Sequence, residues 1–199
     1  MQSVILALAL SSAAAFQAPV AVRQQTCLSA NILDTAKALE GPAIPWGSAG
    51  VLEGHEENEI KGYDGLTTFL AQVEAAGLTD VLNGPGPFTV FAPTDSAFEE
   101  TAREITPELL KYHVVSGVVK SGSISGPIET VQGQSLTYKR FARKTFLDDA
   151  IIGQGPSGAA TGSSFPVDVV CDNGIIHCIS TILYPDYKAP GAEDGLGGI

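Results

Sequence analysis

The stretch that decides the fold reads Phe88-Thr-Val-Phe-Ala-Pro-Thr-Asp-Ser-Ala-Phe98. Its first four residues mix apolar and β-favouring side chains in alternation, which predicts a short strand. A Pro-Thr-Asp sequence then interrupts the strand and begins a helix, for which Thr94 or Asp95 can serve as the N-cap. A strand that passes directly into a capped helix therefore lies at the centre of the chain.

Around this stretch, apolar periodicity predicts helices on the amino-terminal side and short strands on the carboxyl-terminal side. The expected helices are Asn31–Leu39, Leu66–Ala76, a turn at Leu78–Leu82, and one with Thr106 as N-cap and Pro107 in its first turn. The expected strands are Val114–Val119, Ser123–Ile128, Ser135–Phe141, Lys144–Ile152, Val167–Cys171 and Ile175–Leu183. Asn173-Gly174 predicts the last hairpin turn, and Ala43–Gly62 is expected to be irregular. This order of elements predicts an α+β fold.

The composition describes an acidic globular chain. It has 199 residues, 44% hydrophobic and 17% charged side chains, and a formal net charge of −11. Such a chain buries a core without needing metals or disulfides. Its negative charge argues against nonspecific nucleic-acid binding, which depends on basic residues at phosphates.

The amino terminus predicts a targeting segment in two parts. Residues 1–15 contain the short apolar run Val4–Leu10 and a small-residue cleavage site, as in a signal peptide. Residues 16–30 begin with Phe16, contain Arg23 and no acidic residue, and have the composition of a transit peptide. This arrangement resembles the plastid presequence of algae with red-lineage plastids. An ordinary secreted protein whose mature chain begins with Phe is the alternative.

Two further features agree with a non-oxidising compartment and a chain without a membrane span. The cysteines are three, Cys27, Cys171 and Cys178, and no Asn-x-Ser/Thr sequon occurs. We expect Cys171 and Cys178 to be buried, reduced thiols, since an Asn173-Gly174 turn would place them diagonally across a hairpin. The Gly-rich tail, residues 188–199, is expected to be flexible and lacks the apolar end of a lipid-anchor signal.

Three separated segments together resemble the fasciclin-like domain: Thr89–Phe98, the Tyr112-His113 pair, and Asn173–Pro185. The resemblance implies a wedge of two small β-sheets with flanking helices, and a protein that binds other proteins rather than an enzyme. It covers residues 31–187 as one domain. The family pattern has no counterpart for residues 43–64, which we interpret as an insertion.

The insertion contains the only tryptophan, Trp46, next to Pro45 and Gly47. An aromatic side chain on a long loop is typical of an interface anchor. The alternative is a lid in which Trp46 packs on its own domain. The sequence leaves both open.

A basic run at 138–144 stands out in this acidic chain. It carries Lys139, Arg140, Arg143 and Lys144, which could contact an anionic membrane surface or an acidic partner. Solvated charges on an exposed hairpin are the alternative. We add Tyr112 and His113 to the candidate partner-binding residues because of the resemblance, although a hydrogen-bonded core histidine is the simpler reading of His113.

Other patterns do not support an enzyme. Gly153–Gly158 fits G-x-G-x-x-G, but Gly162 and Pro166 follow where a dinucleotide site needs a helix. His55 with its neighbouring glutamates reads as a solvated loop rather than a cation site. We therefore predict no catalytic residues, no cofactor and no metal. The predicted function is a protein-interaction module of an algal plastid, associated with a thylakoid complex. A secreted adhesion protein is the alternative, and a flavin- or nucleotide-binding enzyme is a remote one.

Overall fold

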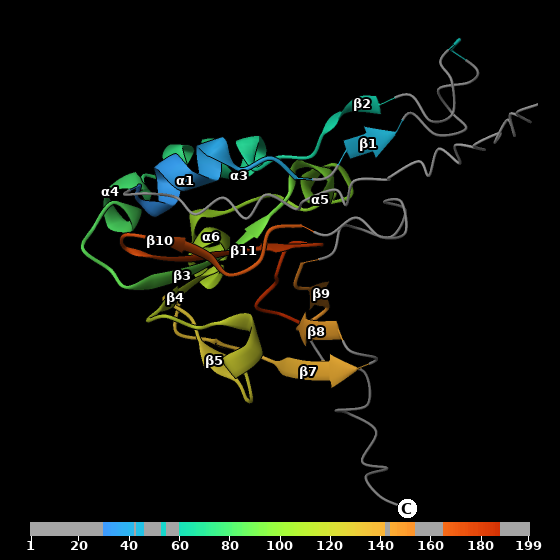
Figure 1. Ribbon diagram of the computed structural model, residues 1–199. Coiled ribbons are helices and arrows are strands. Elements are labelled where there is room, and N and C mark those ends of the chain that lie inside the picture. The colour runs from blue at the N-terminus through green and yellow to red at the C-terminus, as the bar shows by residue number, and fades with distance from the viewer. Residues whose placement is uncertain are drawn as a thin grey trace, which may run out of the picture.

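The computed structural model describes residues 30–41, 43–45, 53–54, 60–141, 144–153 and 165–187. The α+β class is confirmed: helices α1, α3 and α4 cover one face of a central sheet, and smaller sheets lie beyond its other face (Figure 1). The predicted presequence, the Gly-rich tail and most of the G-x-G-x-x-G run lie outside the described residues.

The central sheet has the strand order β10-β11-β3-β4. Its strands are β3 Phe88–Pro93, β4 Val114–Ser116, β10 Val169–Cys171 and β11 Gly174–Ile179. The two middle strands, β3 and β11, run parallel and are buried on both faces. Val90 and Ala92 pack under the helices, whereas Phe91 between them packs against the smaller sheets. The strand predicted from Phe88–Phe91, which is β3, therefore lies in the middle of the molecule.

The helices confirm most of the expected positions. They are α1 Ile32–Ala38, α3 Thr67–Ala75, α4 Thr79–Leu82, α5 Asp95–Glu99 and α6 Pro107–Tyr112. Thr106 caps α6 as predicted, because its hydroxyl accepts a hydrogen bond from the Leu109 amide at 3.2 Å. The next residues continue directly into β4, but Gly117, with φ of 106°, ends the strand earlier than expected.

The capping of α5 differs from the prediction. Thr94 occupies the N-cap position but makes no side-chain cap hydrogen bond. The carboxylate of Asp64 accepts from the Ser96 amide of α5 at 3.2 Å, while Asp95 accepts from the Thr67 and Thr68 amides of α3 at 3.2 and 2.6 Å. Each helix is thus capped by an aspartate from the start of the other: Asp64 shortly before α3, and Asp95 as the first residue of α5. The two N-termini are held together in this way.

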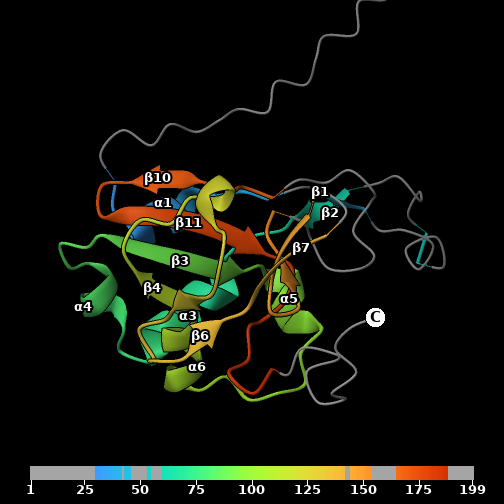
Figure 2. The same cartoon turned by 90° about the horizontal axis from the view of Figure 1, so that it is seen from below.

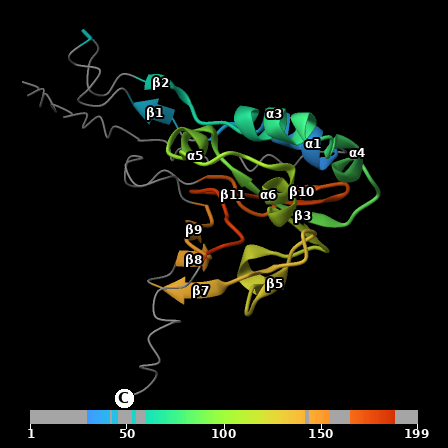
Figure 3. The ribbon, with the colours of Figure 1, turned by 180° about the vertical axis from the view of Figure 1, so that it is seen from behind.

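The strands beyond the central sheet are shorter than expected, and turns divide them. They are β5 Ile128–Glu129 with β6 Ser135–Leu136, and the three-stranded sheet β7 Tyr138–Phe141, β8 Lys144–Leu147 and β9 Ala150–Ile151. A 3-10 turn, η1 Ser121–Ser123, stands where a strand was expected to begin. Figure 3 shows these strands below the central sheet, on the side away from α1 and α3.

The predicted register of the β10–β11 hairpin is wrong by two residues. Cys171 lies opposite Gly174 and Val169 opposite Ile176, so the turn is Asp172-Asn173. Gly174 is instead packed against β3: a Cβ atom there would lie 2.0 Å from the Phe88 carbonyl oxygen. This register places Cys178 further from Cys171 than the predicted diagonal pair. Both remain buried thiols, as expected.

The segment expected to be irregular contains a small hairpin. Ala43–Pro45 (β1) pairs antiparallel with Ile60–Tyr63 (β2). We call residues 43–45 and 60–63 the β1–β2 arm. Its base is fixed by a hydrogen bond of 2.7 Å from the Gly41 amide to the Asp64 carbonyl oxygen. The arm extends beyond the helical layer near α5 (Figure 1), as the view from below also shows (Figure 2).

Candidate interaction surfaces

Two of the predicted site residues, Trp46 and Arg143, lie outside the described residues. The structure separates the remaining ones into a buried group and an exposed group. Tyr112 and His113 are buried at the end of α6, and Lys139, Arg140 and Lys144 are exposed on the β7–β8 hairpin. The structure therefore does not bring the predicted residues together into one site.

Tyr112 connects α6 to the strands below it. Its side chain is 2% exposed, and its hydroxyl donates a hydrogen bond of 2.9 Å to the buried carboxylate of Asp148. Burial, with that carboxylate beside it, raises the pKa of Tyr112. The other carboxylate oxygen of Asp148 accepts from the Thr137 amide at 2.8 Å. Tyr112 thus positions the strands that carry the basic residues, from inside the core.

His113 connects α6 to the segment that follows β11. Its Nδ1 lies 2.9 Å from the Leu109 carbonyl oxygen and donates to it, and its Nε2 accepts from the Leu183 amide at 3.0 Å. This pattern requires the neutral imidazole. Burial lowers the pKa of His113 from 6.5 to about 4. The reading of His113 as a hydrogen-bonded core residue is confirmed, and neither it nor Tyr112 presents surface to a partner.

The cationic hairpin, which we define as residues 138–141 and 144–147, is exposed along most of β7. Phe141 is 68% exposed, and Lys139, Arg140 and Lys144 beside it are exposed. The strand pairing places Lys144 opposite Phe141. Within the described residues, none of these cations forms an ion pair. This hairpin therefore presents positive charge and an aromatic ring together to solvent.

The β1–β2 arm presents two large side chains of a different kind to solvent, one aliphatic and one aromatic. Ile60 is 53% exposed and Tyr63 is 63% exposed, on one short strand. Neither residue is among the site residues predicted from the sequence, which predicts no strands in residues 43–62. Behind the arm, the buried carboxylate of Asp64 accepts hydrogen bonds from the Gly65 and Ser96 amides. The exposed side chains thus stand on a firmly anchored base.

One cluster of serine, aspartate and histidine was not predicted, because its members are far apart in the sequence. The Ser121 hydroxyl donates to Asp168 at 2.5 Å, and the Asp168 amide donates to Nδ1 of His177 at 3.2 Å. Nε2 of His177 is also occupied, 2.7 Å from the Val119 carbonyl oxygen. Burial lowers the pKa of His177. The hydrogen bond with the Val119 carbonyl group and the negative charge of Asp168 act in the opposite direction, but their effect is smaller. Since serine contacts the aspartate rather than the histidine, this cluster lacks the nucleophile–base pair of a hydrolase.

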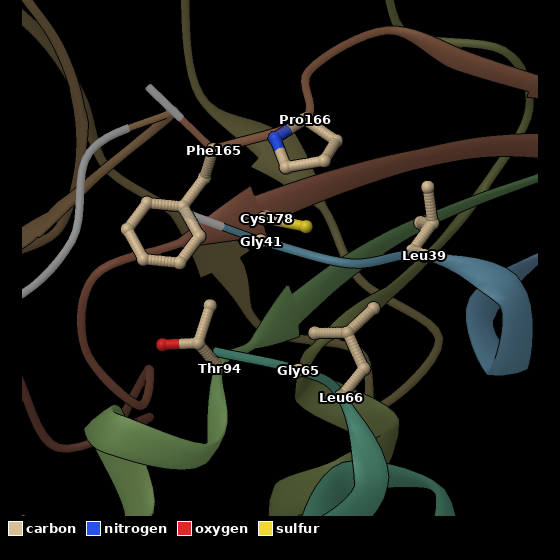
Figure 4. A pocket seen from close by; sticks show the side chains of 8 residues that line it. All are labelled: Leu39, Gly41, Gly65, Leu66, Thr94, Phe165, Pro166 and Cys178. Carbon is tan, nitrogen blue, oxygen red and sulfur yellow. The ribbon is translucent and has the colours of Figure 1, made fainter. Parts of the chain in front are cut away.

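A small cavity lies between α1, α3 and the end of β11. Its volume is about 10 Å³, barely the space that one water molecule needs. Figure 4 shows the residues that line it, Leu39, Gly41, Gly65, Leu66, Thr94, Phe165, Pro166 and Cys178. Burial raises the pKa of the Cys178 thiol to about 12, so this sulfur is a poor nucleophile. The cavity is far too small for a nucleotide or a flavin.

In the part of the chain that the structure describes, no group of three or more His, Cys, Asp or Glu side chains is arranged to hold a metal ion. No helix in this part of the chain is long and apolar enough to cross a membrane.

Comparison with known proteins places these features in a family. Residues 64–185 match the fasciclin domain model. Protein sll1483 of Synechocystis sp. is 31% identical over 62% of this chain and 69% of its own length. Transforming growth factor-beta-induced protein ig-h3 of Sus scrofa is 31% identical over 66% of this chain, which matches only 19% of that longer protein.

Among solved structures, a domain pair from the insect cell adhesion molecule Fasciclin I matches 71% of this chain and 52% of that chain, with a TM-score of 0.45 and 18% identity. That likeness is too low to carry an argument. The family model covers more than half of the chain and includes all three segments singled out in the sequence. The chain belongs to the fasciclin domain family.

Proposed function

We propose that this protein is a non-enzymatic interaction module that binds a partner protein through the β1–β2 arm. The observation that carries the proposal is the exposure of Ile60 and Tyr63 on a hairpin that precedes the family match at residues 64–185. Exposed apolar and aromatic side chains are the residues that supply binding energy when a partner covers them. Because the arm lies outside the matched domain, it suits a partner particular to this chain.

The arm is built to keep its shape while it binds. Its base is fixed by the Gly41–Asp64 hydrogen bond, and Asp64 in turn caps α5. A pre-ordered surface loses little conformational entropy on association, which favours affinity. Trp46, which we also propose as an interface anchor, follows β1 directly in the sequence and lies outside the described residues.

For the compartment, we propose an algal plastid, with a thylakoid complex as the partner. Support comes from the apolar run Val4–Leu10, from Phe16 after the small-residue site, and from the acid-free stretch that ends at Ala30. The second candidate is a secreted cell-surface or matrix adhesion protein, which the signal-peptide-like residues 1–15 alone would explain. A reporter fused after Ala30 separates the two, since it accumulates in plastids in the first case and in the medium in the second.

Partner capture from the native cells tests the arm directly. We expect the double variant Ile60→Ser/Tyr63→Ser to weaken partner binding by about 2 kcal/mol or more, the scale of interface hot spots. Its melting temperature should change little, because both side chains already face solvent. The measurement is a pull-down followed by titration of the captured protein.

The matched control is Val170→Ser on β10, where an apolar side chain is 60% exposed but lies on the central sheet rather than on the arm. This variant should bind as the wild type does. If the arm variant and the control capture the same partner equally well, the arm is not the binding surface.

A further inference from the structure

The cationic hairpin differs from the rest of the surface in charge and in shape. The chain has a net charge of −11, yet Lys139, Arg140 and Lys144 are exposed together and unpaired within the described residues. Arg143 adds a fourth cation in sequence, although it lies outside those residues. The acidic residues Asp148 and Asp149 follow the far end of β8. A partner for this hairpin must therefore be anionic.

The strand register shows how the side chains are divided between the two faces. Leu147 and Ala150 lie on the face that joins the core, with Tyr138 packed beside them. The opposite face carries Lys139, Phe141, Lys144 and Phe146, because cross-strand partners and alternate residues of a strand share a face. Arg140, opposite Thr145, lies on the same face as Tyr138, although its side chain is exposed. The face turned away from the core thus carries two cations, Lys139 and Lys144, together with the two phenylalanines.

Phe141 is the last residue of β7, and it is the most exposed of the large apolar side chains described. The hairpin lies at the edge of the molecule, away from the helical layer (Figures 1 and 3). The cavity in the described residues lies elsewhere, under α1 and α3. A projecting aromatic ring with cations around it suits a soft, negatively charged layer that the ring can enter, rather than a rigid pocket.

We propose that the cationic hairpin binds the surface of an anionic phospholipid bilayer, with Phe141 in the headgroup layer and Lys139 and Lys144 against lipid phosphates. Arg140, exposed on the neighbouring face, adds to the attraction of the anionic surface. This role is additional to partner binding by the β1–β2 arm and does not depend on it. Lipid contact at the hairpin leaves the arm, at the other side of the central sheet, available to a protein (Figure 1). The chain would then be a peripheral membrane protein that holds its partner close to the bilayer.

Co-sedimentation of the full chain with vesicles tests the proposal. The probes are vesicles of phosphatidylcholine alone and of phosphatidylcholine mixed with phosphatidylglycerol. The readout is the ratio of binding to the two, because the apolar run Val4–Leu10 contributes to both alike. We expect the wild type to prefer the anionic vesicles, and the preference to fall as salt is raised.

The decisive variant is Lys139→Gln/Arg140→Gln/Lys144→Gln. Each cation near an anionic surface contributes about 1 kcal/mol, so the variant should bind anionic vesicles about 100-fold more weakly. Phe141→Ser should lose about tenfold. The matched control, Lys37→Gln/Lys111→Gln/Lys120→Gln, removes three exposed cations elsewhere and should retain the preference. The arm variant Ile60→Ser/Tyr63→Ser should also retain it, which separates this proposal from the protein-binding one.

Three results would overturn the proposal. The wild type shows no preference for anionic vesicles, the hairpin triple variant and the control triple variant lose equal amounts of vesicle binding, or the hairpin triple variant binds anionic vesicles as the wild type does. If vesicles are not bound but the hairpin variant loses capture of an acidic protein, the occupant is that protein and the lipid proposal is wrong. Unchanged circular dichroism of each variant confirms that exposed substitutions have left the fold intact.

Discussion

Asn173→Ala is expected to destabilise the domain by about 4 kcal/mol, the largest effect of any single polar substitution considered. The side-chain amide of Asn173 donates to the Leu82 and Gly84 carbonyl oxygens at 2.6 and 3.1 Å, and its oxygen accepts from the Ile32 amide at 2.9 Å. The residue is buried, so alanine leaves three backbone groups without partners. Urea unfolding, together with a fall in melting temperature of about 10 °C, measures the effect.

Asn83→Ala is the matched control for Asn173. The Asn83 side chain also makes a hydrogen bond, accepting from Asn31 at 2.9 Å, but the pair is exposed. Water replaces the lost partner there, and the cost should stay below about 0.5 kcal/mol. Similar losses for the two variants would show that Asn173 does not connect α1, α4 and the last hairpin as the structure indicates.

Lowering the pH from 7 to 4 is expected to remove about 3 kcal/mol of stability through His113 alone, taking 1.36 kcal/mol per pKa unit. Burial depresses the pKa of the folded imidazole from 6.5 to about 4. The folded state therefore binds fewer protons than the unfolded chain between these values. The contribution of His113 is complete above pH 6.5, falls as the pH drops, and is lost below about pH 4.

NMR titration of the histidine Cε1 protons checks this directly, since the chain has three histidines in all. Loss of one resonance in His113→Gln assigns the signal. We expect His113 to remain neutral until about pH 4, and urea midpoints of the wild type to fall over the same range. A His113 resonance that titrates near 6.5 in the folded protein would contradict the buried, doubly hydrogen-bonded ring.

Elements with local signals were predicted well from the sequence. Thr106 and Pro107 fixed the start of α6, because capping and the restricted φ of proline act within a few residues. The alternation at Phe88–Phe91 predicted a strand that proves to be β3, although its burial on both faces depends on the parallel partner β11. Such features need no knowledge of distant residues.

Features that depend on tertiary contacts were missed. Asn173-Gly174 has the composition of a tight turn, but Asn173 bonds to α1 and α4, and Gly174 allows the close approach of β3. The hairpin therefore shifts by two residues. In the same way, Asp64 and Asp95 cap one another's helices rather than their own, which no local pattern encodes.

For the candidate surfaces too, the sequence predicts what depends on local composition and misses what depends on tertiary contacts. A run of cations at 139–144 predicts an exposed hairpin, because unpaired lysine and arginine side chains are rarely buried. Tyr112 and His113 were predicted as site residues only because of the family resemblance. In the structure, both side chains are buried and hold neighbouring elements together from within the core. The β1–β2 arm was not foreseen, since its short strands pair across a long gap in sequence.

Hydrogen–deuterium exchange of the protein, alone and bound to its captured partner, shows whether the β1–β2 arm is the binding surface. We expect exchange to slow at the amides of β1 and β2, while the already protected β3 and β11 change little. The Ile60→Ser/Tyr63→Ser variant should show no such protection. Protection that appears elsewhere on the surface and leaves the arm unchanged would show that the partner binds another surface.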